Sequence, residues 1–459
     1  MSGPRQLGMK VSGPPGKPTR ARFVVLAFAC VGAALAYLTR NAIAVAESTV
    51  RGDLGFTKEQ SGWLMGAFFI TYSLGQIPAA QVGRRLGSRQ SLSLFAVLSS
   101  LGAVGSAFAT GLGSAVLARG VQGIGQAGLV PLSTVIVSRW FPLTGRAFAT
   151  GALASFMSAG GALCAWLTGL LLEALSPRVA TGWNWRWTFL IFSVPGFIWA
   201  AWFWRWFRDE PKTHSSVNAL ELDLITGNVN APDELAVAGV TASVQEATPW
   251  LSLISSPALW WLCTQQAFRS AGYVFFSSWF ATYLQETRGV SISKSGFLSM
   301  LPLLALVAGS LAGGAVSDWL LRRTGSRNLA RRWLSIIAMI ASAGLIFWAR
   351  TVQEALPAVL LISTGSFFAG TASPCAYALT IDMGGRHIGA INATMNMIGN
   401  FGALLFPLAA PWMLARFGNW DAVIGLFAGI YICAAACWML LKTEGTMLDQ
   451  ALFKKGKEA

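Results

Sequence analysis

The chain has 459 residues, of which 54% are hydrophobic and only 12% are charged. A soluble domain carries about 25% charged residues, so the composition excludes an ordinary soluble protein. The net charge of +15 does not indicate nucleic-acid binding, because the basic residues gather in short segments between long apolar stretches.

Twelve apolar stretches follow one another along the chain, each long enough to cross a hydrocarbon core, which takes about 20 helical residues. They do not alternate as the strands of a membrane barrel would, and helices satisfy their own backbone in lipid. The sequence therefore predicts an all-α polytopic membrane protein. The expected spans are residues 23–47, 60–82, 92–111, 114–137, 147–172, 187–206, 256–284, 295–318, 333–349, 355–380, 388–415 and 421–441.

Basic residues are abundant before span 1, after spans 2 and 8 and in the tail, and they are sparse in the loops of the other side. The positive-inside rule then places both termini in the cytoplasm. Span 1 is too long for a signal peptide and is expected to be retained. We expect an integral protein of the plasma membrane (the inner membrane of a bacterium), a monomer surrounded by lipid.

One long polar stretch, residues 207–250, divides the spans six and six. It is too short and too polar to build a core of its own, so we expect a cytoplasmic linker. It would join an N-terminal six-helix bundle, 23–206, to a C-terminal six-helix bundle, 251–442. Cytoplasmic segments, 1–22 and 443–459, would flank the two bundles.

The two halves echo each other, since QVGRRLGSRQ follows span 2 and GGAVSDWLLRRTGSR follows span 8. This arrangement resembles the major facilitator superfamily. The strings TYSLGQIPAA, GIGQAGLVP, RWFP, WNWRWTF and NMIGNFGALLFP are similar to its anion–cation symporter branch. That branch includes bacterial sugar-acid carriers, sialin and vesicular glutamate transporters. The resemblance implies the major facilitator fold, two pseudo-symmetric bundles that rock about a central site.

Three arginines lie inside apolar spans: Arg40 in span 1, Arg119 in span 4 and Arg269 in span 7. Each would cost roughly 2.5–3.5 kcal/mol in lipid, and spans 2 to 11 hold almost no carboxylate to pair with them. We interpret them as holding an anionic substrate, because the guanidinium fork binds carboxylate or phosphate through two hydrogen bonds. Snorkelling to the interface is the alternative. The resemblance favours binding, since family members carry matching arginines.

Further substrate-binding residues are expected near the arginines. Tyr37 lies one helical turn before Arg40 and shares its face. Tyr72 stands where the resemblance implies a binding tyrosine. Hydroxyls of a sugar acid would bond to three polar residues of spans 10 and 11, which are Ser373, Asn396 and Asn400. Helix–helix hydrogen bonding or packing is the alternative for each of them.

The coupling positions depart from the family pattern. The resemblance implies an Asp before the span 1 arginine and a Glu in span 4 as proton carriers, and here these positions hold Thr39 and Gln126. Neither side chain titrates, so we expect Gln126 to hydrogen-bond the substrate instead. Glu47, two turns after Arg40, is the candidate for a relocated proton carrier. The alternative is a solvated residue at the span end, and co-transport of a proton or another cation stays open.

The family carries an Asp in the basic turn after the second span of each half. The second turn keeps it as Asp318, a gating candidate, whereas the first turn has Arg84 at this position. Asp382 and Arg386, near the end of span 10, would form either a gate or an ordinary surface pair.

The sequence thus predicts a secondary transporter of a small organic anion, a sugar acid or a mono- or dicarboxylate, that works by alternating access. An organophosphate or phosphate exchanger is the rival within transport. We expect no enzyme, no catalytic residue and no cofactor. We also expect no metal site, because the six cysteines lie inside spans without metal spacing and the two histidines are far apart.

Overall fold

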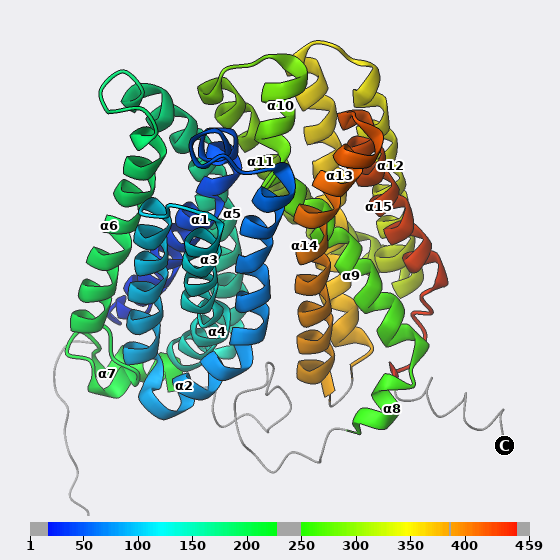
Figure 1. The fold of residues 1–459 in the computed structure, drawn as a ribbon. Helices are drawn as coiled ribbons and strands as arrows, with labels where there is room; N and C mark the ends of the chain where they lie inside the picture. The colour runs from blue at the N-terminus through cyan, green and yellow to red at the C-terminus, as the bar shows by residue number, and fades with distance from the viewer. Residues whose placement is uncertain (1–16, 227–248, 385–386, 448–459) are drawn as a thin grey trace, which may run out of the picture.

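A computed structural model describes residues 17–226, 249–384 and 387–447. The described residues form helices, turns and loops, and no β-strand occurs among them. The helices gather into two bundles that stand side by side (Figure 1), with α1 to α6 in one and α8 to α15 in the other. The fold is therefore all-α, as the sequence predicts.

The first half contains six long helical segments. Predicted spans 2 and 3 form one helix, and predicted span 4 is divided at Gly128. The elements are α1 (Ala21–Leu54), α2 (Lys58–Ala107), α3 (Leu112–Ala127), α4 (Leu129–Trp140), α5 (Leu143–Leu175) and α6 (Trp183–Trp206).

Short elements lead from the first half into the second, and predicted span 7 is divided into two helices. The elements are η1 (Pro211–Thr213), α7 (Ala219–Thr226), α8 (Trp250–Ile254), α9 (Pro257–Phe276), α10 (Phe280–Arg288), α11 (Ile292–Thr324), η2 (Asn328–Trp333), α12 (Leu334–Trp348), η3 (Ala349–Thr351), α13 (Ala355–Asp382), α14 (Ile388–Phe417) and α15 (Trp420–Leu440).

Ten helices within the described residues are long and apolar enough to cross a membrane. The difference from the twelve predicted spans lies in two helices. Helix α2 counts once although non-helical backbone at Gly87 divides it, and α9 is absent from the ten. Helix α9 has 20 residues but carries Gln265, Gln266 and Arg269, which lower its hydropathy. The first difference thus arises from a kink within one continuous helix, and the second arises from polar residues within a helix that the sequence also predicts.

Two helix pairs, α5 with α11 and α2 with α14, make the main contacts between the halves. A Cβ on Gly62 of α2 would lie 2.5 Å from the carbonyl oxygen of Pro407, and one on Gly296 of α11 would lie 2.4 Å from that of Ala165. Membrane helices associate through such close packing, because lipid supplies no hydrophobic force between them. Helix α1 also contacts α10 and α11 of the second half.

The predicted linker is partly folded against the first half. Its described residues, 207–226 and 249–250, lie at one end of the bundles, called the linker end below, where α7 and α8 are seen (Figure 1). Glu221 of α7 is fully buried and accepts hydrogen bonds of 3.1 Å from the backbone amides of Ala21 and Arg22. These amides begin α1, where the N-cap residue makes no side-chain bond, so the linker supplies the missing cap.

Gly87 divides α2 at the linker end, and its backbone (φ 80°, ψ 165°) is open only to glycine. A Cβ there would lie 2.7 Å from Oδ2 of Asp209. Gly87→Ala is therefore expected to lower the free energy of unfolding by about 1–3 kcal/mol, measured as thermal unfolding of the purified protein. Gly429→Ala is the control, since nothing lies within 4 Å of its Cβ position. Equal melting temperatures for the two variants would contradict the strained kink.

Candidate functional site

Arg40 lies in the middle of α1, inside a cage of four aromatic rings that we call the aromatic cage. Its guanidinium carbon lies 4.7 Å from the ring centre of Phe68, 4.8 Å from Phe69, 5.1 Å from Tyr37 and 5.3 Å from Tyr72. The side chain is only 8% exposed. No carboxylate of the described residues lies within ion-pair distance of it. Cation–π contacts bring about 0.5–2 kcal/mol each and leave the N–H donors of Arg40 for an anion.

Arg119 of α3 packs beside Arg40 and is 4% exposed. Its Nη1 donates to the carbonyl oxygen of Arg40 at 3.2 Å and to Oε1 of Gln122 at 2.6 Å. Its guanidinium carbon lies 5.2 Å from the ring centre of Phe68, so the two arginines share this ring. The Nε of Arg119 is buried without a hydrogen-bond partner among the described residues. Two cations thus lie side by side, and no acid of the described residues forms an ion pair with either of them.

Arg269 of α9 is half-buried, and its Nε and Nη2 donate to Oε1 of Gln266 at 3.2 and 3.0 Å. One turn further along α9, Tyr273 lies within electrostatic reach of Tyr37 and Arg40. The second half therefore approaches the aromatic cage through Tyr273, with Arg269 one turn nearer the linker end.

Ser373, Asn396 and Asn400 are half-buried, and no hydrogen bond of their side chains occurs within the described ranges. Asn396, Asn400 and Leu404 recur every four residues and share one face of α14. Leu404 packs against Gly66 of α2. This face of α14 is therefore turned toward the first half, with its two amides on the linker side of the packed contact.

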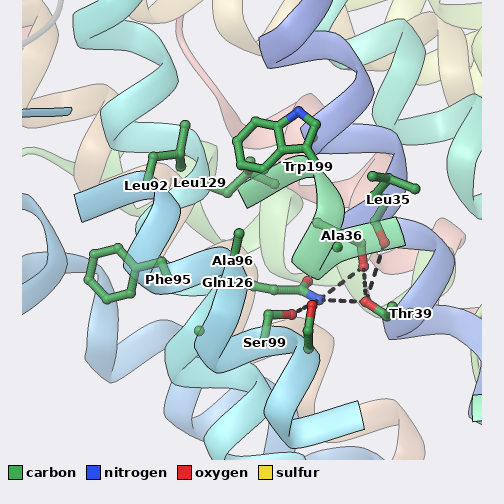
Figure 2. Close-up of a pocket in the computed structure, with 14 residues that line it drawn as sticks. Leu35, Ala36, Thr39, Leu92, Phe95, Ala96, Ser99, Gln126, Leu129 and Trp199 are labelled. Atoms are coloured by element: carbon green, nitrogen blue, oxygen red, sulfur yellow. Dashed lines mark hydrogen bonds between the residues drawn. The ribbon is translucent and has the colours of Figure 1, made fainter. Parts of the chain in front are cut away.

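Gln126 and Thr39 border a small cavity inside the first half (Figure 2). Nε2 of Gln126 donates to the carbonyl oxygen of Ala36 at 2.9 Å, to Ser99 Oγ at 3.1 Å and to Thr39 Oγ1 at 3.3 Å. With a volume of about 40 Å³, the cavity has room for a few water molecules and is too small for a sugar acid. The side-chain nitrogen of Gln126 is thus committed to α1 and α2, while Oε1 is buried without a partner among the described residues.

Glu47 lies away from the aromatic cage and is buried, with 1% exposure. It accepts hydrogen bonds of 2.8 Å from Arg51 Nε and from Thr282 Oγ1 of α10. The nearby bond from Ser48 to Gln285 (2.5 Å) also joins α1 to α10. Helix α10 stands at the end of the bundles away from α7 and α8, called the opposite end below (Figure 1). Glu47 is therefore part of a contact between the halves.

Glu286 of α10 belongs to the same contact. Arg51 Nη2 donates to its carboxylate at 2.9 Å, Lys58 Nζ at 2.6 Å and Trp420 Nε1 at 2.9 Å. Burial opposes its ionisation, but the hydrogen bonds from Lys58 and Trp420 and the charges of Lys58 and Arg51 outweigh it, so the pKa of Glu286 is lowered. The carboxylate is therefore ionised at neutral pH and attracts both cations.

Asp318 and Asp382 lie together at the linker end of the second half. Arg331, 7% exposed, pairs with Asp318 through Nη1 at 3.0 Å and with Asp382 through Nε at 3.6 Å. Arg386 lies outside the described residues, so its expected pairing with Asp382 has no described geometry. Both acids thus share one buried arginine that the sequence did not single out.

The basic turn of the first half lacks the expected Asp and is instead hydrogen-bonded to an acid of the linker. Asp209 Oδ1 accepts hydrogen bonds from the backbone amides of Ser88 (2.7 Å) and Arg89 (3.2 Å). These amides begin the part of α2 that follows Gly87. Linker residue Asp209 therefore holds this turn, although it lies far from it in sequence.

Sequence reasoning missed several residues around the arginines. Gln122 lies three residues after Arg119, so helical spacing could have revealed it. Phe68 and Phe69 carry no such signal, because phenylalanine is common on any membrane helix. Tyr273 likewise becomes visible only when α9 is packed against α1.

Comparisons with known proteins agree with this architecture. A family model described as the major facilitator superfamily matches residues 29–399. A Cupriavidus necator protein named "Probable sulfoacetate transporter" is 28% identical over 403 residues, which are 88% of this chain and 89% of that protein. A D-galactonate transporter of Escherichia coli is 28% identical over 432 residues, covering 93% and 96% of the two chains.

Among solved structures, a bacterial homologue of the human lysosomal transporter Spinster, inward-facing and unoccupied, has a TM-score of 0.71 at 19% identity. The match covers 96% of this chain and 95% of that one. A D-xylose–proton symporter has a TM-score of 0.66 at 17% identity, covering 92% and 99%. At such identities the likeness shows the fold alone.

Proposed function

Because this chain belongs to the major facilitator superfamily and is an integral membrane transporter, we propose that it moves a small organic anion by alternating access. Its relatives include transporters named for galactonate and sulfoacetate. Their ligands share a carboxylate or sulfonate group on a small polar body. The proposed substrate is an anion of this class.

The observation that carries the proposal is the pair of buried arginines without an acid. Arg40 and Arg119 share the ring of Phe68, and no carboxylate of the described residues pairs with either. Two buried cations of this kind are stabilised when an anion reaches them, because charge-assisted hydrogen bonds to guanidinium are strong. The substrate carboxylate would therefore bind between them.

The rest of the substrate would reach the second half. Tyr37 and Tyr72 line the arginine from the first half, and the side chains of Ser373, Asn396 and Asn400 are free to bond hydroxyl groups. Arg269 would hold a second negative group where the substrate has one. The role of Ser373, Asn396 and Asn400 agrees with side chains that are half-buried yet make no hydrogen bond within the described residues.

We further propose that the linker end faces the cytoplasm, since most basic residues lie there, and that the chain resides in a plasma membrane. The contact between the halves that contains Glu47 and Glu286 would then close the transporter on its outer side. Asp318, Asp382 and Arg331 would hold the cytoplasmic end of the second half during rocking. Glu47 would act in gating, because its partners are Arg51 and Thr282.

Proton coupling through Thr39 and Gln126 is not part of this proposal, since neither side chain titrates. Gln126→Glu places a titratable group against Thr39 and Ser99, so uptake is expected to become dependent on pH, or more steeply dependent. The measurement is initial uptake between pH 5.5 and 8 in proteoliposomes. Gln122→Glu, which lies one turn away beside Arg119, is the comparison variant. An unchanged pH profile in Gln126→Glu would count against this position as the coupling site.

The proposed function is tested by uptake in proteoliposomes. Labelled sugar acids, dicarboxylates, a short sulfonate and glycerol phosphate would be compared, with and without an imposed pH gradient. We expect saturable uptake of a carboxylate or sulfonate, and counterflow when the vesicles are preloaded. Uptake of the phosphate ester alone would instead support an organophosphate carrier, and no uptake of any anion would overturn the proposal.

A further inference from the structure

The carboxylate of Glu286 occupies a well-formed anion site at the opposite end. Three donors of two chemical kinds converge on it, the cationic groups of Arg51 and Lys58 and the indole N–H of Trp420. Lys58 also stands over the Trp420 ring at 5.5 Å. Hydrogen bonds from cations to a carboxylate are the geometry by which proteins bind carboxylate ligands.

The two cations and the carboxylate belong to different halves. Arg51 ends α1 and Lys58 begins α2, whereas Glu286 and Trp420 lie on α10 and at the start of α15. Separation of the halves at this end would therefore carry Arg51 and Lys58 away from Glu286 together. They would remain close to each other, because only the short turn after α1 separates them.

We propose that Arg51 and Lys58 form a second, transient binding site for the carboxylate or sulfonate of the substrate, which Glu286 occupies while this end is closed. The inference rests on the proposed transport function, since the site is free only in the conformation that opens at this end. In that conformation Glu286 has already moved away from Arg51 and Lys58, so the ligand binds the two cations without displacing it.

The register of α1 connects this site to the arginine of the aromatic cage. Arg51 follows Arg40 by eleven residues, close to three full turns, so both side chains lie near one face of the helix. They are separated by about 16 Å along the axis. An anion captured at Arg51 and Lys58 would thus move along one face of α1 to reach Arg40.

The charges around the site leave it positive when Glu286 departs. Glu47 stays with Arg51, because both lie on α1 four residues apart, whereas Lys58 has no other ion-pair partner among the described residues. Asp53, the nearest other acid on α1, is paired with Arg186. Glu47, Arg51 and Lys58 together carry one net positive charge, which attracts a monoanion. Glu59, which follows Lys58 in the first turn of α2, is exposed, so water and salt screen its charge.

The test compares variants that break the same contact from its two sides. Lys58→Gln removes one of the two ion pairs between the halves and Glu286→Gln removes both, but only the first variant removes a cation. In proteoliposomes at low ionic strength, Lys58→Gln is expected to raise the KM for uptake roughly fivefold, and the effect should shrink in high salt. Glu286→Gln is expected to leave the KM unchanged or to lower it. An increase in KM for Glu286→Gln at least as large as that for Lys58→Gln would overturn the inference, because the contact would then serve only as a clasp.

A second measurement reports the site without transport. Ser48, which donates to Gln285 in this contact, is replaced by cysteine in a Cys433→Ser background, since Cys433 is the exposed native cysteine. Each labelling rate is divided by the rate of the same reagent with a small free thiol, because the thiolate itself favours a cationic reagent. On this scale, an anionic methanethiosulfonate reagent should label Ser48→Cys faster than a cationic one in Glu286→Gln. Adding Lys58→Gln should remove this preference. An unchanged preference would overturn the anion site, whereas failure of wild-type uptake alone would overturn only the proposed function.

Discussion

Replacing Arg40 by alanine is expected to lower uptake of the substrate by about 100-fold. Loss of one partner of a buried, hydrogen-bonded charge pair costs about 2–5 kcal/mol, and every 1.4 kcal/mol corresponds to a factor of ten. Arg40 supplies such a partner, because its guanidinium is 8% exposed and has no acid among the described residues. The measurement is initial uptake and substrate binding by purified protein in proteoliposomes.

Arg40→Lys is expected to recover little of this loss. Lysine keeps the charge but presents a single ammonium group instead of a planar fork, and the four rings of the aromatic cage fit a flat guanidinium. Arg178→Ala is the matched control, since this arginine is exposed at the end of α5. Uptake near the wild-type level in Arg40→Ala, with normal amounts of folded protein, would show that Arg40 is structural.

Arg119→Met is expected to abolish uptake and, at the same time, to leave the stability of the protein without substrate nearly unchanged. A charge inside the membrane costs roughly 2.5–3.5 kcal/mol, and the described residues offer Arg119 no acid to offset this cost. Methionine loses the bonds to Gln122 and to the Arg40 carbonyl, each of which contributes about 1.5–3 kcal/mol because the donor is charged. These bonds offset the cost of the charge, so the melting temperature should change little.

Arg331→Met is the comparison variant, because Arg331 is a buried arginine that is paired with acids. Arg331 is similarly buried, at 7% exposure, but it pairs with Asp318 and Asp382. Its removal leaves two acids without their cation, so the melting temperature should fall. Thermal unfolding of both variants, with and without substrate, provides the measurement. A melting temperature of Arg119→Met as low as that of Arg331→Met would mean that Arg119 holds the fold and not an anion.

The positions of the helices and of the arginines inside them could be predicted from the sequence, because lipid acts on each residue as a nearly uniform solvent. Apolar length alone places the helices, and Arg40 is conspicuous in an apolar run whatever surrounds it. The kink at Gly87 was not predicted, because the run of residues on both sides of it favours helix and the linker residue Asp209 caps it from far along the chain. Local pattern is therefore informative about spans and less so about their breaks.

The partners of the singled-out residues could not be predicted in the same way. Nothing near Glu47 in sequence indicates Thr282, and nothing near Glu286 indicates Lys58, because these pairs form only where two halves meet. Phe68 is one of 28 phenylalanines, and only the packing of α2 against α1 and α3 makes it the ring that two arginines share.

The sequence by itself determined that this protein is an all-helical membrane transporter in two related halves, with arginines inside its spans. These properties depend on hydropathy, charge and motif order, which are local or additive along the chain. Only the tertiary structure decided which side chains surround those arginines, which acid holds which cation and where the halves are joined. Such contacts depend on the packing of helices that are distant in sequence. The free energy of a buried charge depends on the groups that this packing places around it.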